Sequence, residues 1–200
     1  VLLEWLATVS TTDIDEWLKD ENDDEALFVI AEESLQQLTE VAGAKPFIDV
    51  LFQKCSAFLS MSDWPHRYAA LTAFSHVVYD GRAVFKPHVG ELLQAGAHAI
   101  GDGQPLVVFA YLDLLKALVE TFPRITMRQH LDLIVSSTCA CLASPHARVQ
   151  EKACLALQSI LEAVEPRKQR FLPHLPQVIA GLKAVISSGV QHSVSFALTC

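Results

Sequence analysis

Residues 62–81 read SDWPHRYAALTAFSHVVYDG, and the rest of the chain repeats the pattern of this stretch. Asp63 is expected to cap a helix by accepting backbone N–H bonds, and Pro65 suits the first helical turn. Gly81 is expected to end the helix. Apolar residues recur at helical spacing on one face, namely Ala70, Ala73, Phe74 and Val77. The stretch therefore predicts a capped turn followed by a helix rich in small residues.

The same helix returns along the chain at intervals of 39 to 43 residues. Its anchor column holds Leu35, Phe74, Leu114, Leu157 and Leu198. A second set of helices precedes the last four anchors, with one column at Pro46, Pro87, Gln129 and Pro173. Another column follows 13 residues later, at Leu59, Ile100, Leu142 and Ile186. Two independent columns that agree over four copies indicate a repeated pair of antiparallel helices.

A unit of about 40 residues made of two helices is typical of HEAT repeats, and no strand pattern competes with it. One pair cannot cover its own apolar face, so consecutive pairs must stack. We therefore predict an all-α protein, a right-handed α-α superhelix of four to five HEAT repeats. Its second helices would line the concave side and its first helices the convex side. The expected single array covers 1–200, with pairs at about 1–43, 44–81, 85–122, 126–164 and 168–200 and a first helix at Val1–Val9.

The composition is that of a chain that can bury a substantial core, with 51% hydrophobic and 19% charged residues among 200. No apolar run approaches the roughly 20 residues of a membrane span, and the N-terminus has no signal-peptide pattern. The cysteines are odd in number and lie in apolar helical patterns, as reduced intracellular cysteines do. We expect a soluble protein of the cytosol or nucleus. The ends at Val1 and Cys200 suggest an excerpt of a longer protein.

The negative charge of the chain is concentrated in residues 13–25, DIDEWLKDENDDE, which contribute −7 of the net −8. Such a segment is either a solvated linker or a binding surface for a basic partner, because clustered carboxylates attract cations and an aromatic ring can stack on Lys or Arg. The chain has no basic footprint for nucleic acid. The candidate partner-binding residues are Asp13, Asp15, Glu16, Trp17, Asp20, Glu21, Asp23, Asp24 and Glu25.

Metal-binding and catalytic chemistry find little support in the sequence. His88, His130 and His174 share one column of successive first helices, but stacked helices lie roughly 8–10 Å apart and zinc requires each nitrogen within about 2.1 Å. Cys139 and Cys141 point to different helix faces, and no HExxH, P-loop or GxSxG motif occurs. We predict no enzymatic activity, no metal and no cofactor.

Residues 13–81 resemble the karyopherin-β (importin β) family of nuclear transport receptors, most closely its importin β-3-type members. The resemblance rests on the acidic loop around Trp17, the helix AEESLQQLTEVAG (Ala31–Gly43), the segment KPFIDVLF and the turn SDWPHRYAAL (Ser62–Leu71). Beyond residue 81 the likeness is one of general HEAT pattern, as in SPHARVQEKACLAL (Ser144–Leu157). The arginine that follows the HEAT turn is present as Arg67, but Gln150 stands in its column.

This resemblance implies a receptor that clasps protein cargo with a basic localisation signal and the GTPase Ran on its concave face. It also implies that Phe-Gly nucleoporins bind between neighbouring first helices, without contact to nucleic acid or membrane, as the protein shuttles between cytoplasm and nucleus. The alternative is a HEAT scaffold that assembles other proteins, such as a phosphatase or ubiquitin-ligase regulator. The missing arginine at Gln150 predicts an incomplete Asp–Arg ladder between repeats.

Overall fold

The computed structural model describes residues 1–10, 17, 27–164 and 169–188, and every regular element in these ranges is helical. No helix of the described ranges combines the length and apolarity needed to cross a membrane. The longer helices are α3 (Leu27–Ala42), α4 (Ile48–Leu59), α5 (Trp64–Val77), α7 (Val89–Ala99), α8 (Pro105–Thr121), α10 (Leu131–Leu142), α11 (Ala147–Val164) and α12 (Leu175–Ser188). The shorter ones are α1 (Leu2–Leu6), α6 (Arg82–Phe85), η1 (Lys86–His88), α9 (Pro123–Gln129) and η3 (Leu172–His174).

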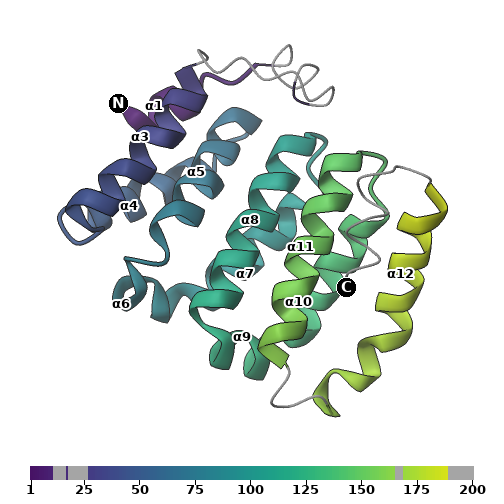
Figure 1. Ribbon diagram of the computed structural model, residues 1–200. Helices are drawn as coiled ribbons and strands as arrows, with labels where there is room; N and C mark the ends of the chain where they lie inside the picture. The colour runs from purple at the N-terminus through teal and green to yellow at the C-terminus, as the bar shows by residue number, and fades with distance from the viewer. Residues whose placement is uncertain (11–16, 18–26, 165–168, 189–200) are drawn as a thin grey trace.

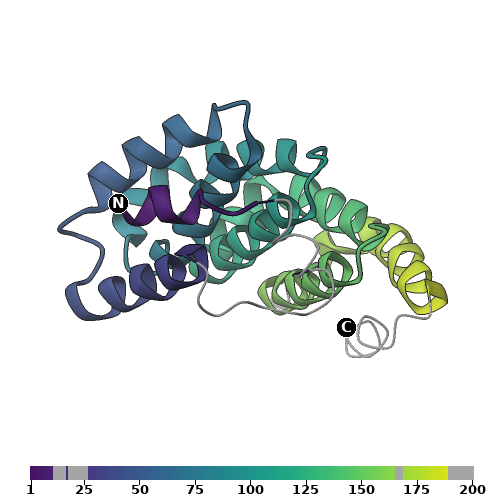
Figure 2. The ribbon, with the colours of Figure 1, turned by 90° about the horizontal axis from the view of Figure 1, so that it is seen from above.

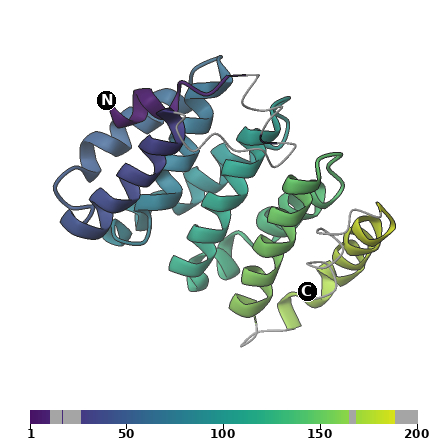
Figure 3. The same ribbon diagram turned by 45° about the horizontal axis from the view of Figure 1, so that its top comes forward.

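The helices form two layers, and consecutive helix pairs follow one another along the array (Figure 1). The second helices α3, α5, α8 and α11 run side by side (Figure 3), and α4, α7, α10 and α12 form the other layer. Seen from above, the array is bent, and α3 and α11 project beyond α8 on its inner side (Figure 2). The second helices therefore line the concave side, and the predicted all-α superhelix is confirmed.

The core lies where the second helices pack on one another and on their first helices. Phe74, Leu114 and Leu157 of the anchor column are fully buried, and Leu35 is 3% exposed. Burying a side chain of this size contributes about 1.5–3 kcal/mol relative to leaving it in water. The apolar column found in the sequence is thus the line along which the pairs are joined.

Three local expectations are wrong. Asp63 occupies the N-cap of α5 without a side-chain cap bond, because its carboxylate is bound to the His66 ring one turn into the helix. Gly81 has an ordinary φ of −82° and is required for space, since a Cβ there would lie 2.8 Å from Ile48 Cδ1. The first helix ends at Leu6, before Val9, where the Thr8 hydroxyl donates to the Trp5 carbonyl at 2.7 Å.

The arginine column shows how the repeats are tied at their turns. Arg67 donates to Asp102 of the next turn at 2.6 and 2.8 Å and to the Met61 carbonyl of its own turn at 3.1 Å. Gln150 keeps the equivalent local bond, to the Ser144 carbonyl at 2.8 Å. Its buried Oε1 has no partner among the described residues. The side chain at Gln150 thus stabilises its own turn, and within the described residues it makes no bond to the next repeat.

Replacing Gly96 by alanine should destabilise the protein. A Cβ at this position of α7 would lie 2.2 Å from the ring of Tyr111, which is fully buried and donates to Ser137 Oγ of α10 at 3.1 Å. Such overpacking costs about 1–3 kcal/mol. Urea unfolding of Gly96→Ala should show this loss. Gly103→Ala is the matched control, because no atom lies within 4 Å of its Cβ position; an equal loss in both variants would contradict this account.

Candidate partner-binding groove

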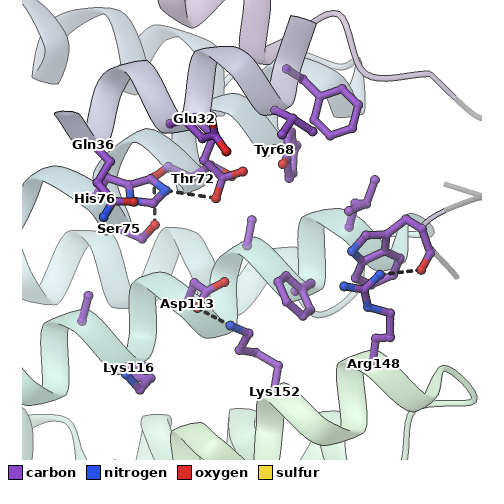
Figure 4. Close-up of a pocket in the computed structure, with 18 of the residues that line it drawn as sticks. Glu32, Gln36, Tyr68, Thr72, Ser75, His76, Asp113, Lys116, Arg148 and Lys152 are labelled. Carbon is purple, nitrogen blue, oxygen red and sulfur yellow. Dashed lines mark hydrogen bonds and ion pairs between the residues drawn. The ribbon is translucent and has the colours of Figure 1, made fainter. Parts of the chain in front are cut away.

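A hollow of about 560 Å³ lies across the concave face, between the second helices α3, α5, α8 and α11 (Figure 4). Its floor is partly aromatic, with Phe28, Tyr68 and Phe109. Its charged and polar lining comes from Glu32, Glu33, Gln36, Thr72, Ser75, His76, Tyr79, Asp113, Lys116, Arg148 and Lys152. A groove that crosses four successive helices suits an extended polypeptide better than a compact ligand.

The cations of this groove are bound to groups of the chain itself. Lys152 of α11 lies 2.6 Å from Asp113 of α8 (Figure 4), and its ammonium group is 4.4 Å from the centre of the Phe109 ring. Lys116 lies 3.1 Å from Glu120, one turn further along α8. Their charge is therefore largely compensated within the groove.

The carboxylates of α3 are less fully compensated. Glu32 lies 3.1 Å from Nε2 of His76 on α5. Glu33 is exposed and has no ion pair with any residue that the structure describes. The α3 side of the groove consequently attracts cations, whereas its α8 and α11 side presents charges that are already paired.

Trp17 is held at the α11 end of the same groove. Its side chain is 8% exposed, and its ring meets Phe109 edge-on at 5.1 Å between centroids. The Arg148 guanidinium carbon lies 4.6 Å from the Trp17 ring centre, and Arg148 Nη1 donates to the Trp17 carbonyl at 2.6 Å. The stacking of Trp17 on a cation, expected with a partner, is made here with the chain's own arginine.

The other candidate residues of the acidic segment lie outside the described residues: Asp13, Asp15, Glu16, Asp20, Glu21, Asp23, Asp24 and Glu25. Their assignment to partner binding stays a prediction. Trp17 connects the segment to α8 and α11, which follow it by two and three helix pairs. The sequence pattern gave no sign of this contact, because Arg148 fitted an ordinary HEAT turn.

A polar cluster at the edge of the groove joins three consecutive helix pairs. Glu120 of α8 accepts hydrogen bonds from the Tyr79 hydroxyl, in the turn that follows α5, and from Ser159 Oγ of α11, the latter at 2.8 Å. Burial alone would raise the pKa of Glu120, but these two hydroxyls and Lys116 together lower it below its ordinary value. Tyr79 and Ser159 lie 41 and 39 residues from Glu120, about one repeat in each direction.

The cysteine and histidine patterns show no arrangement suited to catalysis or metal binding in the described part of the chain. Burial raises the pKa of the Cys55 thiol to about 12 and that of Cys139 to about 11, so both are poor nucleophiles at neutral pH. His88 contacts Glu91 at 2.9 Å and His174 contacts Asp132 at 3.1 Å. No group of three or more potential metal ligands occurs among the described residues.

Comparison with known proteins gives one sequence relative and several structures. The chain is 25% identical over 205 residues to importin subunit beta-3 of Saccharomyces cerevisiae, covering the whole chain and 19% of that protein. Crystal structures of Kap121p bound to RanGTP, to Pho4p and to Nup53p match 99% of the chain at 24% identity, with TM-scores of 0.88, 0.86 and 0.86. The chain resembles karyopherin-β proteins. No protein-family model matches it.

The resemblance expected from residues 13–81 is thereby confirmed, and it extends further than the sequence pattern indicated. Sequence and structure matches both run over essentially the whole chain, including the part beyond residue 81. The chain spans about a fifth of the length of these karyopherins. The binding partners of the longer proteins therefore belong to those proteins as a whole and not to this segment alone.

The Glu120 cluster predicts a pH-dependent stability. A lowered folded-state pKa adds stability above the ordinary value of 4.5, which is lost as the pH falls through the lowered pKa. Tyr79→Phe should therefore cost about 1 kcal/mol or less at pH 7, given the exposure of the pair. The difference from wild type should shrink below pH 4. Urea unfolding between pH 7 and 3.5 measures it, and a cost that does not vary with pH would refute this role of Glu120.

Proposed function

We propose that this chain is a segment of a non-enzymatic nuclear transport receptor, one HEAT array whose concave groove binds basic protein segments. The observation that carries the proposal is the groove across α3, α5, α8 and α11, with Glu32 and Glu33 on one side and compensated cations on the other. Support comes from the match of 99% of this chain to about a fifth of Kap121p, which has been crystallised bound to Pho4p, to RanGTP and to Nup53p. By that likeness the protein exchanges cargo and Ran as it shuttles between cytoplasm and nucleus.

The groove favours an extended segment rich in Lys and Arg. Glu33 has no ion pair within the described residues, so an incoming cation need not displace one. Phe28 and Tyr68 lie beside these carboxylates, with ring centroids 6.5 Å apart, and can contact the aliphatic stem of a Lys or Arg. An acidic segment at residues 13–25 would add long-range attraction for the same partner.

A separate hollow supports binding of Phe-Gly nucleoporins on the opposite layer. It has a volume of about 540 Å³ and lies between the first helices α4 and α7, with Phe52, Leu59, Leu92 and Ala95 in its wall. An apolar slot of this size can take an aromatic side chain. Its position between neighbouring first helices is the one that the karyopherin-β resemblance implies.

Removing the carboxylates of α3 should weaken binding of a basic peptide. In the full-length protein, Glu32→Gln with Glu33→Gln should lower the affinity about three- to tenfold at low salt, because each exposed charge pair contributes about 0.2–1 kcal/mol. The salt dependence should become flatter. Fluorescence anisotropy with a labelled Lys/Arg-rich peptide measures both. Glu91→Gln on α7 is the control, since that side chain is 78% exposed on the other layer.

The acidic segment is tested in the same assay by replacing Asp20, Glu21, Asp23, Asp24 and Glu25 with Ser or Asn. An unchanged affinity would remove the segment from the proposal. A pull-down of the full-length protein with GTP-loaded Ran provides the second readout. Binding of neither Ran nor a basic peptide would overturn the transport proposal and favour the scaffold alternative.

Filling the slot between α4 and α7 should abolish nucleoporin binding without affecting the groove. Ala95→Arg places a long charged side chain in the slot and should weaken binding of a Phe-Gly peptide by about tenfold or more. Ala57→Arg is the control, because Ala57 is exposed on α4 outside the slot. Equal affinities for the two variants would mean that Phe-Gly peptides bind elsewhere.

A further inference from the structure

Exposed cations follow the edge of the array where one helix pair passes to the next. This edge is formed by α6, η1, α9 and the segment leading into α12 (Figure 1). It is distinct from the concave groove and from the slot between α4 and α7. The cations along it are Arg82, Lys86, Arg124, Arg128 and Arg170, which we call the basic edge.

The charges of the basic edge are not compensated by the described part of the chain. None of the five has an ion pair there, although the chain as a whole carries a net charge of −8. Arg82 instead lies over the Phe122 ring at 5.8 Å, and Arg170 donates to the Met127 carbonyl at 3.4 Å. These contacts hold the two side chains in place and leave their charge unpaired.

Two hollows lie between these cations. The first, of about 300 Å³, has Arg82, Lys86 and Arg124 around an apolar floor of Phe122, Pro123 and Ile125. The second, of about 240 Å³, lies one repeat further and is lined by Arg128 and Arg170. Asp132 is the one carboxylate that lines either hollow, and it is paired with His174. Each hollow thus offers positive charge, and the first also offers an apolar surface.

The spacing of the cations fits an extended chain. Arg82 and Arg124 stand 42 residues apart in one column of the repeat, and Lys86 and Arg128 stand 42 apart in another. Stacked helices repeat at roughly 8–10 Å, and in an extended polyproline II conformation every third side chain returns to the same face after about 9 Å. A carboxylate at every third residue would therefore meet one repeat after another.

We propose that the basic edge binds an extended acidic polypeptide segment, with carboxylates on the cations and an apolar side chain against Pro123 and Ile125 in the first hollow. A nucleic acid fits less well, because its bases would need exposed aromatic faces to stack on. Phe122, the aromatic residue of the first hollow, is only 3% exposed.

The test uses the full-length protein and a labelled 15-residue peptide with Glu at every third position and Leu between. Lys86→Glu with Arg128→Glu should weaken its binding about tenfold or more, because reversed charges repel the carboxylates. These two side chains are chosen because both are exposed and neither makes a hydrogen bond or ion pair with the described residues. Lys54→Glu with Lys183→Glu is the matched control, since both lysines are exposed away from this edge and reverse the same charge.

The proposal is supported if the peptide binds wild type and the control pair, and loses affinity in the edge variant. It is overturned if no peptide binds, if both double variants lose affinity equally, or if single-stranded RNA binds the edge in preference to the peptide. Binding of a Lys/Arg-rich peptide to the concave groove should be unchanged in the edge variant. That readout, together with circular dichroism, separates this site from the groove and from unfolding.

Discussion

Everything in this array depends on the burial of α8 between α5 and α11. A single helix pair cannot bury all of its apolar surface. The remaining apolar side is removed from water only when the next pair packs on it. Leu112, Leu114 and Leu115 of α8 are all fully buried, although at 3.6 residues per turn they lie on different sides of the helix. The apolar residues of α8 consequently run around most of the helix, as expected for an interior helix. The layers, the curvature and the concave groove follow from this stacking.

Polar contacts between helix pairs specify how one pair is positioned on the next, which apolar packing alone would specify less precisely. Lys152 reaches Asp113 across 39 residues, and the Tyr79 hydroxyl reaches Glu120 across 41, so each contact joins one repeat to the next. Arg67 provides a third link at the turns. Exposed pairs of this kind contribute little energy individually. Their effect is to fix the register in which one pair sits on the next, and thereby the positions of the charges in the groove.

The sequence predicted the fold well because burial leaves a periodic record, and Phe74, Leu114 and Leu157 mark it in three successive pairs. Local details were predicted less well. Asp63 looked like a capping residue, but its carboxylate binds the nearby His66 ring. Of the residues that line the groove, the sequence indicated Trp17, yet it could not indicate Arg148. Their contact joins residues 131 apart, a separation unrelated to the repeat period, so no column contains it.

The contact between Trp17 and Arg148 changes the mechanics of the array. In an ideal solenoid each pair touches only its neighbours, and bending is distributed evenly over the joints between pairs. A tie from Trp17 to α11 spans the second helices between them, so straightening this stretch requires breaking the cation–π contact and the 2.6 Å hydrogen bond together. The stretch from α3 to α11 therefore behaves as a stiff section. Any change in the curvature of the array is therefore expected at the joints outside this section.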